Sequence, residues 1–95
     1  MPDLPRASII VPVYNAARTL EECIASLLAL DYPRELLELI FVDNASTDTT
    51  QDVLRRYQGT LKILFEAKRG PAAARNMGLQ HARGEVIAFT DSDCI

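Results

Sequence analysis

Two carboxylates near the end of the chain have a spacing that indicates metal chemistry. Asp91 and Asp93 flank Ser92 and directly follow a short apolar run, Val86 to Phe89. In an extended segment, side chains at positions i and i+2 point to the same side. Mg²⁺ in proteins is typically bound by one or two carboxylates together with substrate phosphates. The pair therefore predicts a divalent-metal site, although two acids in a solvated loop would have the same spacing.

Polar residues also follow a second apolar run. Asp43 and Asn44 come directly after Leu36 to Val42, where their side chains can hydrogen-bond the base or ribose of a ligand. Asx and Ser residues after a strand also form the turn and cap of the next helix. We assign that capping role to Ser46 and Asp48, and spacing alone leaves both interpretations open for Asp43 and Asn44.

Two further segments offer an aromatic ring and a group of cations. Pro12-Val13-Tyr14-Asn15 follows an apolar run, and the Tyr14 ring suits stacking on a planar base. A simple strand-to-helix turn is the alternative. Lys68 to Asn76 precedes and opens a helical pattern, where cations and free N–H groups favour an anion. The alternative is a solubilising loop followed by an Arg75 on an exposed helix face.

The histidine and the two cysteines carry less information. His81 has no evident partner, so we expect a surface or packing role. Cys23 lies at an apolar position of a helical pattern, and Cys94 lacks the neighbouring base that a nucleophilic thiol needs.

Hydrophobic periodicity places these groups on an alternating β-α-β-α-β-α-β framework. Short apolar runs predict strands, and apolar spacing of three and four predicts helices. The strands are expected at 7–13, 36–42, 61–65 and 86–89, and the helices near 20–28, after 46–48 and at 71–83. This alternation predicts an α/β fold, a Rossmann-like parallel sheet of order 3-2-1-4 with helices on both faces. The polar groups would then converge at the carboxyl ends of the strands.

Composition narrows the class of protein. The chain has 95 residues, of which 48% are hydrophobic and 24% charged, and its net charge is −3. Such a composition indicates one small globular domain or part of one, and disfavours nucleic acid as a partner. Two cysteines, no long apolar run and no signal-peptide pattern lead us to expect a cytoplasmic location. Association of a longer parent with the cytoplasmic face of a membrane stays open. The chain also lacks the G-x-G-x-x-G, P-loop and G-x-S-x-G motifs. Their absence argues against a dinucleotide-binding Rossmann domain, a P-loop protein and an α/β-hydrolase, respectively.

Taken together, the motifs resemble the family 2 glycosyltransferases with the GT-A fold. The resemblance covers residues 7–94 and rests on I-I-V-P-V-Y-N, D-Y-P, F-V-D-N-A-S-T-D, R-G-P-A-A-A-R-N-M-G and A-F-T-D-S-D, in that order. It implies transfer of a sugar from a nucleotide-diphosphate donor, linked to UDP, GDP or TDP, to a hydroxyl of a glycan, lipid or small molecule. It also implies inversion and the use of Mg²⁺ or Mn²⁺.

The resemblance assigns roles to individual residues. Asp93 would be the metal ligand, with Asp91 nearer the ribose or a metal-bound water. Many members have Asp-Asp where this chain has Asp43-Asn44. Asn44 could still hydrogen-bond the base of the donor, but it lacks the negative charge of the aspartate in those members. The nucleotide-sugar site would comprise Pro12, Val13, Tyr14, Asn15, Asp43, Asn44, Arg75, Asp91 and Ser92.

The resemblance also implies that this chain lacks part of the catalytic apparatus. Family members carry the general base after the D-x-D motif, which here would fall beyond Ile95, so we expect no catalytic base in the chain. We therefore divide it into a flexible lead-in, 1–6, and an incomplete glycosyltransferase domain, 7–95, that is inactive alone. The fourth strand would be an unprotected edge, and we expect the fragment to self-associate through it or to be marginally folded.

Three other classes of protein share parts of this pattern. A sugar-nucleotide pyrophosphorylase has a related sheet but expects a glycine-rich phosphate loop where this chain has Pro-Val-Tyr-Asn. A receiver-type signalling domain expects an early acidic pair and a late lysine. A non-catalytic nucleotide-binding or assembly module is the third.

Overall fold

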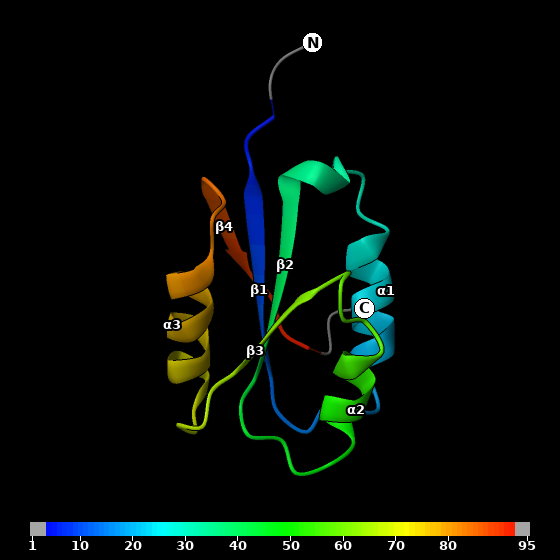
Figure 1. The fold of residues 1–95 in the computed structure, drawn as a ribbon, viewed down its shortest axis with the longest axis vertical. Coiled ribbons are helices and arrows are strands. Elements are labelled where there is room, and N and C mark those ends of the chain that lie inside the picture. The colour runs from blue at the N-terminus through cyan, green and yellow to red at the C-terminus, as the bar shows by residue number, and fades with distance from the viewer. Residues whose placement is uncertain (1–3, 93–95) are drawn as a thin grey trace.

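The computed structural model describes residues 4–92 and contains the alternation of strands and helices that the sequence predicts (Figure 1). The elements are, in chain order, β1 (Ala7–Val13), α1 (Leu20–Leu28), a 3-10 turn η1 (Arg34–Leu36), β2 (Leu37–Asp43), α2 (Thr50–Arg55), β3 (Lys62–Phe65), α3 (Pro71–His81) and β4 (Val86–Phe89).

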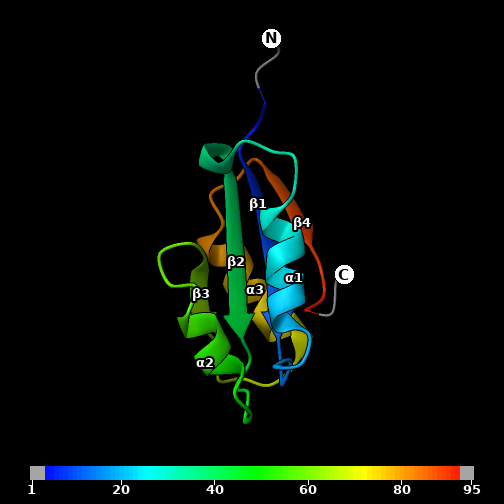
Figure 2. The ribbon, with the colours of Figure 1, turned by 90° about the vertical axis from the view of Figure 1, so that its right-hand side faces the viewer.

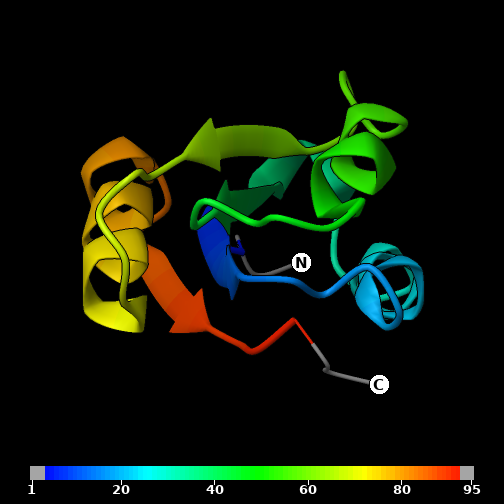
Figure 3. The same ribbon diagram turned by 90° about the horizontal axis from the view of Figure 1, so that it is seen from below.

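The four strands form one parallel sheet in the order β3-β2-β1-β4, which confirms the predicted topology. β1 pairs with β2 from Ala7–Leu37 to Val13–Asp43, and with β4 up to the pair Ile10–Phe89. β4 therefore ends three residues before β1 does. The loops that follow β1, β2 and β4, and the loop that enters α3, gather at one end of the sheet (Figure 3).

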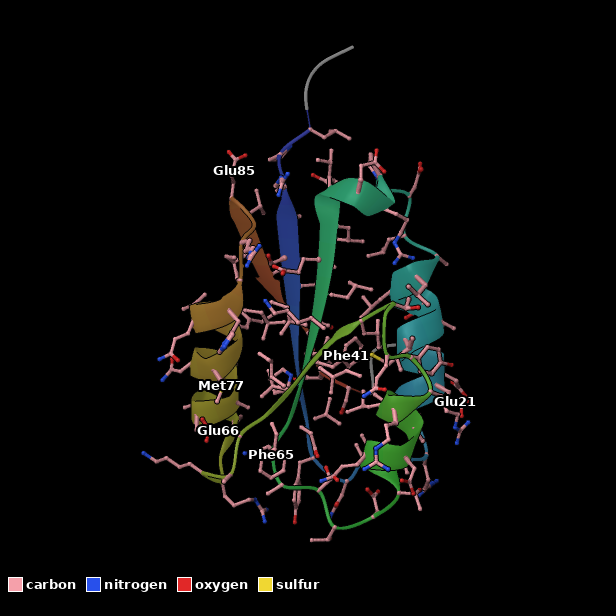
Figure 4. The ribbon with its side chains drawn as sticks, viewed as in Figure 1. Glu21, Phe41, Phe65, Glu66, Met77 and Glu85 are labelled. Atoms are coloured by element: carbon pink, nitrogen blue, oxygen red, sulfur yellow. The ribbon has the colours of Figure 1, made fainter. Side chains whose placement is uncertain are left out.

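Helices cover both faces of the sheet, as predicted. α1 and α2 lie on one side and α3 on the other (Figures 1 and 2). Phe41 points from β2 toward α1 and α2, whereas Met77 lies on α3 (Figure 4). Strands buried on both faces are largely apolar, which explains the runs Ile9 to Val11 in β1 and Leu39 to Val42 in β2. The larger core lies under α1 and α2, and the smaller, Ile10, Ile40, Val42 and Ala74, lies under α3.

Small residues let α3 approach β1 closely. A Cβ at Gly78 would lie 2.4 Å from Ile10 Cγ2, and Ala74 is fully buried. The helix therefore packs closely on the sheet, but it ends at His81 rather than at residue 83, where the sequence predicts its end. Ala82 is already extended, and the Arg83 N–H donates to Glu38 Oε1 at 2.9 Å instead of continuing the helix.

β4 is an edge strand, as expected, with Val86 49% and Phe89 47% exposed. Before β1, the Arg6 carbonyl accepts the N–H groups of Glu85 and Val86, and the Pro5 carbonyl accepts the Tyr32 hydroxyl. Within residues 4–92, no helix has both the length and the apolar character needed to cross a bilayer.

Candidate functional site

A cleft of about 480 Å³ opens at the carboxyl ends of β1 and β4 and at the start of α3. This is the edge of the sheet at which the sequence predicts a ligand site. The lining residues come from four segments: Pro12, Val13, Tyr14, Asn15, Ala16 and Thr19; Asn44; Arg69, Gly70, Pro71 and Arg75; and Asp91 and Ser92. The fold thus brings eight of the nine predicted nucleotide-site residues to one cleft, and the exception is Asp43.

Hydrogen bonds join the loop after β1 to the loop after β2. Asn15, which has a positive φ of 49°, donates its N–H to Ser46 Oγ and accepts the Thr47 N–H on its Oδ1 at 2.7 Å. Two residues on, the Ala17 N–H donates to Asp48 Oδ2 at 3.3 Å. The side-chain oxygen of Asn15 is therefore bound to the protein, although the residue lines the cleft.

Asp48 anchors the start of α2 in this joined pair of loops. Its Oδ1 accepts the Thr50 N–H at 2.9 Å. Bonds from the Thr50 hydroxyl, and from the N–H groups of Thr50 and Ala17, stabilise its carboxylate and lower the pKa of Asp48 below its ordinary value. Asp48 thus binds the first helical N–H of α2, as predicted, although the N-cap position itself is Thr49. The capping role predicted for Ser46 is wrong, because the Ser46 hydroxyl accepts the Asn15 N–H instead.

The Asn44 side chain ties the end of β2 to the loop that enters α3. Asn44 is 5% exposed, and its Nδ2 donates to the Glu66 carbonyl at 2.9 Å and to the Lys68 carbonyl at 2.8 Å. Its Oδ1 accepts the Gly70 N–H at 2.9 Å. The amide uses both N–H donors and its carbonyl oxygen on the protein itself, so contact of this side chain with a ligand base stays a prediction.

Asp43 lines a different cavity from its neighbour. It is 2% exposed and borders a pocket of about 190 Å³ between α2 and β3. Its Oδ1 accepts the Ser46 N–H at 3.2 Å, whereas its buried Oδ2 accepts no hydrogen bond from the described part of the chain. A buried carboxylate oxygen without a donor costs free energy. Contact of Asp43 with the base or ribose of a ligand stays a prediction.

The segment after β4 crosses from the sheet to the start of α1. The Thr90 N–H donates to the Ile10 carbonyl at 3.1 Å, the Thr19 hydroxyl donates to the Ser92 carbonyl at 3.3 Å, and the Cys23 thiol donates to the Asp91 carbonyl at 3.7 Å. These contacts place Asp91 on the cleft wall. Cys23 is fully buried, as expected for a core residue.

One of the two carboxylates of the predicted metal site, that of Asp91, lies in the described part of this segment. Asp93 and Cys94 lie outside the described residues, and residues 4–92 contain no cluster of three acidic, histidine or cysteine side chains. The cleft does contain the Asp91 carboxylate, and one or two carboxylates suffice for Mg²⁺ when substrate phosphates supply further oxygens. The metal prediction is thus compatible with Asp91, and the role of Asp93 stays a prediction.

Two arginines give the cleft its positive charge. Arg75 projects from α3 and Arg69 from the preceding loop, and the Arg69 guanidinium carbon lies 3.7 Å from the centroid of the Tyr14 ring. The predicted site did not include Arg69. The Lys68-Arg69 pair before a helix had indicated an anion site, but sequence alone does not show which of these cations turns into the cleft. The other lining residues that were not predicted are Ala16, Thr19, Gly70 and Pro71.

Comparisons with known proteins agree with the fold. The family model described as "Glycosyl transferase family 2" matches residues 8–95. The chain is 38% identical, over 96% of its length, to the glycosyltransferase AglE of Haloferax volcanii.

Two solved structures have the same arrangement of elements. Residues 1–349 of Staphylococcus aureus TarS, in complex with UDP-GlcNAc, superpose with a TM-score of 0.85 at 36% identity over 93% of this chain. The mannosyltransferase PcManGT of Pyrobaculum calidifontis, in complex with GDP-Man and Mn²⁺, gives a TM-score of 0.84 at 41% identity over 94% of this chain. The predicted GT-A type of fold is therefore confirmed.

The chain is much shorter than these proteins. It spans 31% of AglE, 26% of the TarS chain and 28% of PcManGT. The family match over residues 8–95 nevertheless spans all the strands and helices described above except the first residue of β1. On the family match, the identities and the fold, the chain belongs to glycosyl transferase family 2.

Proposed function

We propose that the chain is the donor-binding part of an enzyme that transfers a sugar from a nucleotide-diphosphate sugar to an acceptor hydroxyl. The observation that carries this proposal is the cleft itself. It combines an aromatic ring at Tyr14, cations at Arg69 and Arg75, and a carboxylate at Asp91. These are groups that suit a base, a diphosphate and a divalent cation, respectively.

The relatives support a nucleotide-sugar as the ligand. TarS is in complex with UDP-GlcNAc, and PcManGT with GDP-Man and Mn²⁺. In this chain, Tyr14 is 43% exposed and offers a ring for stacking with a base. Asp43 borders the neighbouring cavity and its Oδ2 is buried, so a hydrogen bond from the base or ribose would require that oxygen to become exposed. UDP, GDP and TDP are therefore the donor nucleotides to test.

The charged residues of the cleft are suited to the departure of the nucleotide diphosphate. Negative charge develops on the leaving diphosphate during transfer, and fixed cations stabilise it. Arg75 would contribute such a cation from α3. Asp91, with Asp93, would bind Mg²⁺ or Mn²⁺, which supplies Lewis-acid stabilisation of the leaving group.

The groups that would bind the acceptor and determine the stereochemistry of transfer lie in the remainder of the proposed enzyme. We propose inversion, which requires a general base near the acceptor hydroxyl. That base and the pocket for a glycan, lipid or small-molecule acceptor would come from sequence beyond Ile95. The 95-residue chain would then bind the donor without completing transfer, at a cytoplasmic location.

Titration calorimetry on the 95-residue chain tests donor binding. We expect UDP, GDP or TDP to bind more tightly with MnCl₂ than without it. Asp91→Ala and Asp93→Ala should each weaken the metal-dependent binding more than about tenfold, since even residues that only support metal ligands typically contribute about 10- to 100-fold. Asp31→Ala is the charge-matched control, because Asp31 is exposed and lies in the turn after α1, outside the cleft lining.

Two outcomes would contradict the proposal. The first is the absence of binding of any of the three nucleotides to a chain whose circular dichroism shows the folded state. The second is metal-dependent binding that Asp91→Ala and Asp93→Ala leave at the level of the Asp31→Ala control, which would remove the proposed metal site from this segment.

A further inference from the structure

Arg69 covers a ring that the proposed donor needs. Its guanidinium carbon lies 3.7 Å from the centroid of the Tyr14 ring, and both residues line the cleft. A planar guanidinium at this separation is in stacking contact with the ring. A nucleotide base stacks at a similar separation, so Arg69 and a base exclude one another from this face of Tyr14.

The backbone on both sides of Arg69 is held in place. The Asn44 side chain donates to the Lys68 carbonyl and accepts the Gly70 N–H. Gly70 has a φ of 124°, a conformation that side-chain-bearing residues rarely adopt. Because the loop is fixed at both neighbours, Arg69 leaves the ring by rotation of its own side chain and stays at the cleft.

The relative strengths of the two contacts favour the base. A cation–π contact at an exposed site contributes about two- to fivefold to an equilibrium constant. Stacking of a base on an aromatic side chain contributes about five- to 150-fold. A base that stacks on the face covered by Arg69 therefore displaces the guanidinium, at a small cost in affinity.

The displaced cation then has an anionic partner within the ligand. Without Arg69, the charges of Arg75 and Asp91 on the cleft wall balance one another. With Arg69 the described wall has an excess of positive charge, which suits a diphosphate. A guanidinium also presents several N–H donors in a fork that matches phosphate oxygens.

We infer that Arg69 is a donor-binding residue that leaves the Tyr14 ring when the nucleotide enters and pairs with its diphosphate. The inference rests on the proposed function, because it requires a nucleotide in this cleft. It assigns Arg69 opposite effects on the two halves of the ligand. The residue opposes binding of the nucleoside and favours binding of the charged group.

A comparison of nucleoside and nucleotide separates these effects. Calorimetry would measure uridine and UDP, and guanosine and GDP, on the wild-type chain and on three variants. Arg69→Ala should bind the nucleoside about two- to fivefold more tightly than wild type, because the competing contact is lost. It should bind the diphosphate about tenfold more weakly, because a charge-assisted contact is lost.

Two variants serve as controls. Arg69→Lys keeps the charge but not the planar fork, so we expect it to recover most of the diphosphate affinity while its nucleoside affinity stays above wild type. Lys68→Ala removes the same charge from the neighbouring position of the same exposed loop. It should leave nucleoside affinity unchanged and alter diphosphate affinity less than twofold.

The outcomes distinguish this inference from the proposed function. If the wild-type chain binds a diphosphate and Arg69→Ala changes nucleoside and diphosphate affinity by the same factor, or changes neither, the inference is wrong and the proposed function stands. If the folded wild-type chain binds no nucleotide, both are wrong.

Discussion

Replacement of Asn44 by aspartate tests whether this side chain is a structural bridge. Its Nδ2 donates to the carbonyls of Glu66 and Lys68, and its Oδ1 accepts the Gly70 N–H. A carboxylate keeps the acceptor but has no N–H to donate. Asn44→Asp would therefore place a charged oxygen against two carbonyl oxygens at a position that is 5% exposed.

The expected loss of stability follows from the number of donors removed. A buried polar group left without its partner costs about 1–3 kcal/mol. Two carbonyls lose their donor here, and the lower half of that range gives about 2–4 kcal/mol at neutral pH. Domains of this size have a free energy of unfolding of roughly 5–15 kcal/mol, so the change is large enough to measure.

The loss should depend on pH in a defined direction. A protonated carboxyl regains one O–H donor, so folding favours the protonated form and raises the pKa of the introduced group above its unfolded value of about 3.9. A group with a raised pKa in the folded state stabilises that state most at low pH. The difference from wild type should therefore be smallest below about pH 4 and should grow as the pH rises through the raised pKa.

Urea unfolding followed by circular dichroism between pH 4 and pH 7 measures this difference. Asn44→Ala is the uncharged control. Its loss of stability relative to wild type should not change with pH in this range. Asn76→Asp introduces the same charge on the exposed side of α3 and should change stability by less than about 0.5 kcal/mol. Equal stability of Asn44→Asp and wild type at pH 7, or a loss that shrinks as pH rises, would refute the bridge.

Two further predictions concern other parts of the chain. Burial raises the pKa of Glu38, but hydrogen bonds from the Arg83 N–H and the Ser8 hydroxyl, with the charge of Lys62, lower it overall below 4.5. The stability advantage of wild type over Glu38→Gln in urea should therefore be present above about pH 4.5 and disappear as pH falls through the lowered pKa; an advantage that increases on acidification would contradict this. Along β4, Phe89→Lys should reduce the concentration-dependent association that we expect in sedimentation equilibrium, because charge on an edge strand opposes pairing. A wild-type chain that sediments as a monomer at every concentration would rule the association out.

The strand order and the position of the cleft could be predicted because they depend on local patterns. The apolar runs of β1 and β2 and the alternation with helices favour a parallel sheet with both faces covered. A parallel sheet brings the carboxyl ends of its strands to one edge, so Tyr14, Asn44 and Asp91 meet there. The end of α3 was less predictable, because Arg83 exchanges a helical hydrogen bond for one with Glu38, 45 positions earlier in the sequence.

The direction of individual polar side chains could not be predicted in the same way. Asp43 and Asn44 are adjacent in sequence, yet Asp43 lines the cavity beside α2 and Asn44 lines the larger cleft. Successive side chains of a strand point to opposite faces, so alternation accounts for the divergence of the two residues. Which loops and cavities lie on each face depends on the tertiary structure. Here the loop at 66–70 forms hydrogen bonds with both the Nδ2 and the Oδ1 of Asn44.

The sequence by itself determined the family, the order of the elements and the edge of the sheet where the candidate site lies, because periodic burial and short motifs are properties of neighbouring residues. The tertiary structure decided which polar groups serve the fold and which face the cleft. An asparagine amide or an arginine guanidinium can bond equally well to a ligand or to the protein. Only the positions of the Glu66 carbonyl, the Gly70 N–H and the Tyr14 ring show that Asn44 anchors the loop and that Arg69 lies over the ring.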